Sequence, residues 1–132
     1  MSGFIKIAVF VVVLTAMTPS PGMADVFTRA NSLFRCATFA EEGGMPEEKS
    51  KLEGEGFMAL FQKYLSQSEQ THKEHDSRLI YAAHLVGFNQ GIAHAHASMR
   101  IDPKFVGGDK AQNSRQAYVN ENCGLLLEGI RP

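Results

Sequence analysis

The sequence lacks the motifs that identify several common classes of enzyme and cofactor protein. It has no tryptophan and only two cysteines, Cys36 and Cys123, so it contains neither the CxxC motif of thiol oxidoreductases nor the CxxCH motif of c-type haem proteins. The GxSxG, SxxK and Cys–His patterns of nucleophilic hydrolases are also missing. We therefore expect a protein that is not an enzyme and carries no cofactor.

An excess of charge of one sign is missing as well. Thirteen Lys and Arg residues face 14 Asp and Glu residues, which gives a formal net charge of −1 with neutral histidines. Nucleic-acid-binding proteins need a basic stripe that neutralises phosphates, so we expect no nucleic-acid partner. The five histidines would make the charge more positive as the pH falls below about 6.5.

Residues 1–24 are predicted to be a cleaved secretory signal peptide. Lys6 supplies the positive charge, residues 7–14 supply the apolar run, and Ala24 is a small residue suited to the position before the cut. The apolar run is shorter than the ~20 residues that a membrane-spanning helix needs, although an uncleaved anchor is the alternative. Residues 19–22, with two prolines and a glycine, are expected to interrupt any helix. Residues 25–132 would then form one domain, periplasmic or secreted, with no membrane anchor.

Cys36 and Cys123 are predicted to form a disulfide. An even pair of cysteines in a short exported chain is most simply a disulfide in an oxidising compartment. The bond would close a loop of 87 residues, which is worth roughly 4 to 5 kcal/mol in the chain-entropy treatment. Two separate buried thiols are the alternative.

Turn signals divide the mature chain into four predicted helices. Apolar residues recur at three- and four-residue steps over residues 25–42, and Gly43 and Gly44 end this segment. The second helix begins at Pro46, or only at Glu55 if Gly54 and Gly56 weaken its first half. The third covers residues 76–100 and the fourth residues 113–129, joined by a loop over residues 104–110. The expected fold is thus an all-α four-helix bundle closed by one disulfide between its first and last helices.

The third helix has apolar residues on two sides, which is typical of a helix in the middle of a bundle. One side carries Leu79, Ala83, Val86, Ala93 and Ala97, and the other carries Tyr81, Leu85, Phe88, Ile92 and Met99. Gly87 and Gly91 lie between these faces, so we expect another helix to approach closely there. A leucine at position 91 should then destabilise the protein through overpacking.

The histidines are the best candidates for a metal site. His72 and His75 have the i, i+3 spacing that one ion can use, with Glu69 and Asp76 nearby. His94 and His96, in contrast, diverge by about 200° on a helix and cannot share an ion. We predict no specific metal site, and we keep a histidine-dependent metal-binding or metal-handling protein as the alternative.

The organisation resembles two families of small exported helical proteins. One is the periplasmic immunity proteins that neutralise type VI secreted amidases, and the other is the periplasmic acid-stress chaperones. The resemblance rests on the sequence around Cys36 (residues 33–36), the small-residue helix over residues 81–97 and the sequence before Cys123 (residues 118–123). It implies a protein that binds other proteins. Low charge and many histidines differ from the Lys- and Asp-rich chaperones, which favours the immunity proteins.

We therefore expect a periplasmic, non-enzymatic protein-interaction domain of the inhibitor or immunity-factor kind. On the first helix Phe39 points almost opposite the apolar stripe, so it is either covered by a loop or exposed for a partner. The predicted partner-binding surface combines Phe39 and Phe105 with the loops over residues 43–46 and 102–109. The sequence gives no prediction of the oligomeric state.

Overall fold

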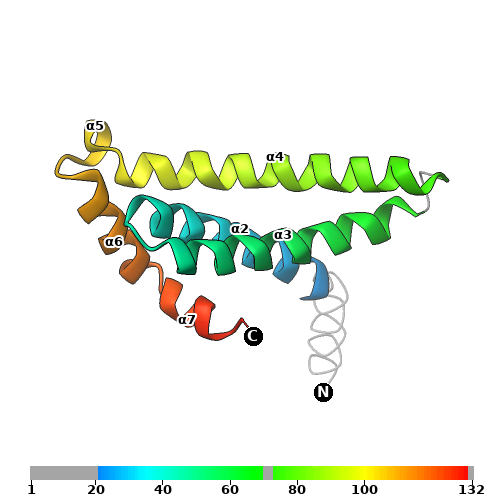
Figure 1. Ribbon diagram of the computed structural model, residues 1–132, viewed down its shortest axis with the longest axis horizontal. Helices are drawn as coiled ribbons and strands as arrows, with labels where there is room; N and C mark the ends of the chain where they lie inside the picture. The colour runs from blue at the N-terminus through cyan, green and yellow to red at the C-terminus, as the bar shows by residue number, and fades with distance from the viewer. Residues whose placement is uncertain (1–20, 70–72, 131–132) are drawn as a thin grey trace, which may run out of the picture.

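The computed structural model describes residues 21–69 and 73–130, and this part of the chain is helical and contains no strand. Figure 1 shows three long helices followed by three short ones at one end of the molecule. Their bounds are α2 Pro21–Glu42, α3 Pro46–Ser68, α4 His75–Ile101, α5 Pro103–Val106, α6 Lys110–Asn120 and α7 Cys123–Glu128. The predicted all-α class is confirmed, but the described residues form six helices instead of the expected four.

The three long helices pack on one another, and the short ones close one end. α4 lies along the outer side of the α2–α3 pair over most of its length, while α6 and α7 run away from the C-terminal end of α4 (Figure 1). α6 contacts both α2 and α4, and α7 contacts α2 and α3. The C-terminal helices therefore rest on all three long helices.

The turn between α2 and α3 forms as the sequence predicts. Gly44 has φ +80°, a conformation that an L residue with a side chain rarely adopts. Pro46 occupies the first turn of α3, where its missing N–H costs nothing, and Glu47 and Glu48 follow at the positive end of the helix dipole. The predicted start at Pro46 is confirmed. The alternative start at Glu55 is wrong, because α3 continues without a break through Gly54 and Gly56.

The predicted fourth helix is interrupted. α6 begins at Lys110, where the Asp109 side chain accepts hydrogen bonds from the backbone N–H groups of Ala111 and Gln112. It ends at Asn120, and Asn122 then adopts a left-handed conformation with φ 57° before α7 begins. Asparagine tolerates this conformation better than most residues, which explains why the chain turns here. The predicted loop over residues 104–110 contains the short α5, which Asp102 caps.

The disulfide between Cys36 and Cys123 is present, as predicted. It joins α2 to α7 with an S–S distance of 2.01 Å and a Cα–Cα distance of 5.5 Å, and both residues are at most 1% exposed. The hydrophobic cluster around it contains nine buried residues from α2, α3, α4 and α7: Leu33, Cys36, Ala37, Phe39, Ala40, Leu52, Ala97, Ile101 and Cys123. The bond is thus part of the main core.

The middle helix of the structure is α2, and the prediction that the third helix takes this place is wrong. α2 contacts α3, α4, α6 and α7. α4 buries one side only: Ala82, Val86, Ala93, Ala97 and Ile101 are all 0% exposed. On its other side Phe88 is 66% and Met99 58% exposed. The two apolar faces of α4 are equivalent in the sequence, and tertiary packing covers only one of them.

The predicted close approach at Gly87 and Gly91 is also wrong. A Cβ atom added at either position would have no neighbour within 4 Å, because both glycines border a surface groove. The close glycine contact lies instead on α3, where a Cβ atom at Gly56 would come within 2.8 Å of Phe34 Cε1. Gly56 therefore lets α3 approach the second core cluster, which contains Ala30, Phe34, Leu60, Val86 and Ala93.

The predicted signal peptide lies mostly outside the described part of the chain. Residues 1–20, which contain most of it, lie outside the described residues. Pro21 and Gly22 belong to α2. The expectation that residues 19–22 interrupt a helix also concerns residues 19 and 20, which lie outside the described residues. In the part of the chain that is described, no helix is both long and apolar enough to cross a membrane.

Two matched substitutions on α3 test the packing at Gly56. Gly54→Ala adds a methyl group in open space and gains helix propensity of up to ~1 kcal/mol. Gly56→Ala gains the same propensity but forces the buried Phe34 ring to move, which costs ~1–3 kcal/mol. Urea unfolding should therefore find Gly56→Ala less stable than Gly54→Ala by at least ~1 kcal/mol. Equal unfolding midpoints for the two variants would contradict this account.

Candidate functional site

The candidate histidine pair, His72 and His75, is only partly within the described residues. His72 lies outside them, and His75 is an exposed residue at the start of α4. Within residues 21–69 and 73–130, no three His, Cys, Asp or Glu side chains come together in a way that could hold an ion. The described residues thus supply no complete ligand set for the histidine-dependent alternative.

His94 instead borders a polar groove between α2, α3 and α4, with a cavity volume of about 370 Å³. Its ring Nδ1 lies 3.2 Å from the hydroxyl oxygen of Thr38. Because that hydroxyl donates to the carbonyl oxygen of Phe34, the ring Nδ1–H is the donor to Thr38. Across the groove Lys49 and Glu53 form an ion pair of 3.0 Å, and this hydrogen-bonded carboxylate raises the pKa of Lys49. The His94–Thr38 contact ties α4 to α2, whereas the Lys49–Glu53 pair lies within α3.

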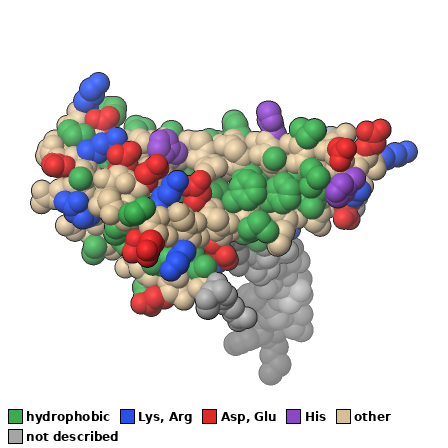
Figure 2. All heavy atoms as spheres, viewed as in Figure 1, with side chains coloured by type: hydrophobic (Ala, Val, Ile, Leu, Met, Phe, Trp, Pro, Cys, Tyr) green, Lys and Arg blue, Asp and Glu red, His purple; other side chains and the backbone are tan. Residues whose placement is uncertain are grey.

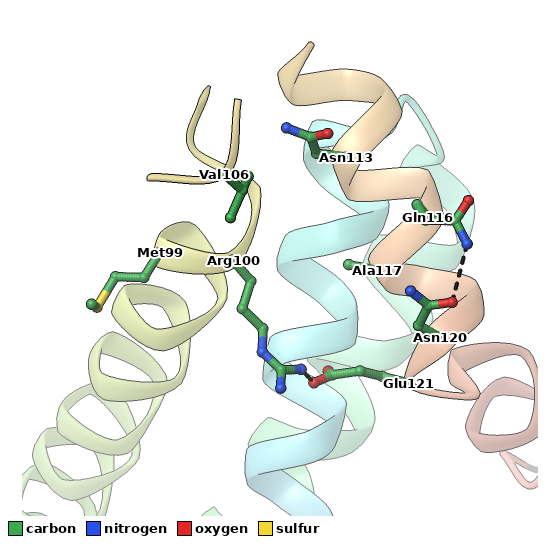
Figure 3. A pocket seen from close by; sticks show the side chains of 8 residues that line it. All are labelled: Met99, Arg100, Val106, Asn113, Gln116, Ala117, Asn120 and Glu121. Carbon is green, nitrogen blue, oxygen red and sulfur yellow. Dashed lines mark hydrogen bonds and ion pairs between the residues drawn. The ribbon is translucent and has the colours of Figure 1, made fainter. Parts of the chain in front are cut away.

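A larger hollow, of about 530 Å³, lies at the C-terminal end of α4. Figure 3 shows its side chains coming from the last turn of α4, from α5 and from one face of α6. We call it the end groove and define it by the residues that line it: Met99, Arg100, Val106, Asn113, Gln116, Ala117, Asn120 and Glu121. The α6 residues among them, 113, 116, 117 and 120, share one helical face because they are spaced by three or four residues.

An ion-pair cluster fixes one wall of the end groove. Glu121 pairs with Arg100 at the end of α4 and lies 3.6 Å from Arg35 Nε on α2, and its side chain is only 14% exposed. Arg35 and Glu121 stand close to the disulfide in the sequence, next to Cys36 and two residues before Cys123. Charge attraction and the covalent bond therefore hold the end of α6 against α2 and α4.

Amide side chains shape the rest of the end groove. Asn113 Nδ2 donates to the carbonyl oxygens of Gly107, at 2.7 Å, and Ile101, at 3.2 Å, and so fixes the loop after α5. Gln116 Nε2 donates to Asn120 Oδ1 at 3.0 Å along α6 (Figure 3). Both residues are exposed, so their amide groups face solvent at the rim. The groove thus presents amide hydrogen-bonding groups.

Two large apolar side chains line the groove beside these amide groups. Met99 on α4 is 58% and Val106 on α5 is 53% exposed. Phe105, which was predicted to bind a partner, precedes Val106 on α5 and is 66% exposed. The end groove therefore combines exposed apolar groups from α4 and α5 with a few amide groups.

The structure separates the two predicted partner-binding residues. Phe39 is 0% exposed, so it cannot contact a partner, and it belongs to the main core. The prediction that Phe39 binds a partner is therefore wrong, and the side chain is packed among helices and is not covered by a loop. The loop over residues 43–46 lies beside α6, where Arg115 Nη1 donates to the carbonyl oxygen of Gly43 at 3.4 Å. This loop therefore contacts α6 through Arg115, which is not one of the residues that line the end groove.

Sequence reasoning named Phe105 and the loop over residues 102–109 but missed the other half of the end groove. The segment that became α6 has low hydropathy, so it gave no reason to single out Asn113, Gln116 and Asn120. Their spacing of three and four residues is a signal that could have identified a polar helical face. The comparisons with protein-family models, with curated proteins and with solved structures find no match for this chain.

The ion-pair cluster gives a prediction about stability. Glu121→Gln removes the negative charge that two arginines share in a largely buried position, so the free energy of unfolding should fall by about 1–2 kcal/mol. Glu53→Gln removes the partner of Lys49 at a half-buried position, where Lys49 and Glu53 are 30% and 35% exposed, and should change the free energy of unfolding by less than about 0.5 kcal/mol. Chemical denaturation of both variants measures the difference. A loss for Glu121→Gln no larger than that for Glu53→Gln would refute the structural role of the cluster.

Proposed function

We propose that the protein is an exported, non-enzymatic domain that binds a protein partner at the end groove. The observation that carries the proposal is one hollow lined by exposed apolar side chains from α4 and α5. Met99 and Val106 in its lining, and Phe105 next to Val106 in the sequence, are each more than half exposed. Contiguous apolar groups rimmed by polar ones are typical of protein-binding surfaces.

The chemistry of the groove favours an extended segment of a partner protein. A hollow of about 530 Å³ is large enough for one or two apolar side chains. The amide groups of Gln116 and Asn120 both donate and accept hydrogen bonds, which suits the N–H and C=O groups of an extended backbone. We therefore infer a partner loop that inserts an apolar side chain and bonds through its main chain.

Several interactions hold the end groove in one shape in the absence of a partner. The disulfide, the Glu121 ion pairs and the Asn113 hydrogen bonds fix α6 and the loop after α5 on the long helices. A surface that is ordered in the free protein loses less conformational entropy on binding, which favours affinity. This rigidity suits an inhibitor or immunity factor, which must bind its target tightly.

The disulfide and the predicted signal peptide both support a periplasmic location. A disulfide in the main core persists in an oxidising environment such as the periplasm. The predicted signal peptide over residues 1–24 would deliver the chain there. A periplasmic inhibitor or immunity factor is the form of this function that we propose.

Photo-crosslinking tests the proposed surface. A photoreactive phenylalanine analogue at position 105 should crosslink to one defined protein in the periplasm. The same analogue at position 125 should not, because Leu125 is equally exposed, at 68%, but lies on α7 outside the end groove.

The crosslinked protein, once purified, should bind the wild-type chain in calorimetry. Phe105→Ser should weaken this binding at least about tenfold, and the matched control Leu125→Ser should not. Equal crosslinking at positions 105 and 125, or full binding by Phe105→Ser, would exclude the end groove as the partner site.

A further inference from the structure

The outer face of α4 carries apolar side chains that the described structure leaves exposed. Between Arg78 and Arg100 the helix contains no charged residue. Along this stretch Ile80 is 68%, Phe88 66%, Ile92 37% and Met99 58% exposed. Figure 1 shows α4 on the outside of the α2–α3 pair, and Figure 2 shows hydrophobic side chains gathered on the surface over α3 and α4. An uncharged apolar face of this length is suited to packing against another helix.

The spacing on this face is that of a coiled coil. Six residues follow one another at alternating steps of four and three: Tyr81, Leu85, Phe88, Ile92, Ala95 and Met99. These are successive d and a positions of a heptad repeat, with Leu85, Ile92 and Met99 at a and Tyr81, Phe88 and Ala95 at d. We call this row the heptad face. It lies on the side of α4 opposite the buried Ala82, Val86 and Ala93.

We propose that α4 packs in antiparallel orientation against α4 of a second copy of the protein through the heptad face. In this register each residue of one α4 helix faces the residue of the other whose number brings the sum of the two to 180; each such pair is one layer of the interface. Phe88 faces Ile92 of the partner, Leu85 faces Ala95, and Tyr81 faces Met99. Every layer then joins an a position to a d position, and the middle layers of the interface pair a larger with a smaller side chain.

A hollow on the heptad face fits this arrangement. It has a volume of about 430 Å³ and is lined by Ser77, Ile80, Tyr81, His84 and Leu85. In the antiparallel register this is the position that Met99 of the second copy reaches. A side chain of one helix inserting among four or five residues of the other is the packing unit of coiled coils.

Charges at the two ends of α4 select the antiparallel orientation. The register places Arg78 near Asp102 of the second copy, which directly follows α4. A parallel pair would instead place Arg78 beside Arg78 and Arg100 beside Arg100, which is repulsive. No charge lies between these ends to oppose the contact of two identical faces.

Sedimentation equilibrium of the purified protein tests the association. The mass should rise from that of one chain to that of two as the concentration increases from micromolar toward millimolar. Phe88→Glu should remain monomeric over this range, since a charge would be buried at the centre of the interface. Phe88 is exposed in the single chain, so this variant should still fold, which circular dichroism checks. Phe105→Glu, changed at a position of the same exposure outside the heptad face, should still dimerise.

Cysteine crosslinking tests the orientation. When Leu85→Cys and Ala95→Cys proteins are mixed and oxidised, the antiparallel pair should give crosslinks between the two variants and none within either. Residue 85 lies ~15 Å along the axis from residue 85 of the partner in this register, and the same holds for residue 95. Crosslinks within each variant alone would show a parallel pair and overturn the proposal. A wild-type mass of one chain at the highest concentration, or dimerisation of Phe88→Glu, would also overturn it.

Discussion

The disulfide between Cys36 and Cys123 is the constraint on which the C-terminal half of the structure depends. α6 has 11 residues and α7 has six, and helices of this length are marginal in water without tertiary contacts. Neither contributes many large buried side chains: Ser114 of α6 and Cys123 of α7 are their buried residues. The covalent bond to α2, inside the main core, therefore supplies what the hydrophobic contacts of these short helices do not.

The geometry of the end groove depends on this bond. Glu121, which pairs with Arg100 and lies near Arg35, stands two residues before Cys123, so the bond brings the carboxylate within reach of both arginines. That position of α6 completes the end groove beside Met99 and Val106. The second apolar surface, the heptad face of α4, does not involve the disulfide. The two surfaces share Met99, which lines the end groove and also belongs to the heptad face, and we propose a different partner for each surface.

Local signals in the sequence predicted much of the fold, whereas the choice among equivalent faces depended on long-range packing. Pro46 defines the start of α3 through backbone chemistry that acts within a few residues, so this prediction is confirmed. The two apolar sides of α4 look alike in the sequence, and the positions of α2 and α3 decide which is buried. Phe39 was predicted to bind a partner because it points away from the apolar stripe of its own helix, and the packing of the other helices around α2 buries it. At the site, Phe105 was identifiable as an apolar residue in a loop, but the face formed by Asn113, Gln116 and Asn120 acquires meaning only when α6 lies beside α4.

Hydrogen exchange of the oxidised and the reduced protein tests most directly whether the disulfide organises the C-terminal helices. Our account predicts that reduction accelerates exchange of the α6 and α7 amides at least about tenfold, because these helices lose their covalent attachment to the core. The amides of α4 around Val86 and Ala93 should keep most of their protection, because the second core cluster contains neither cysteine. Unchanged exchange in α6 and α7 after reduction, or an equal loss of protection throughout the protein, would contradict the account.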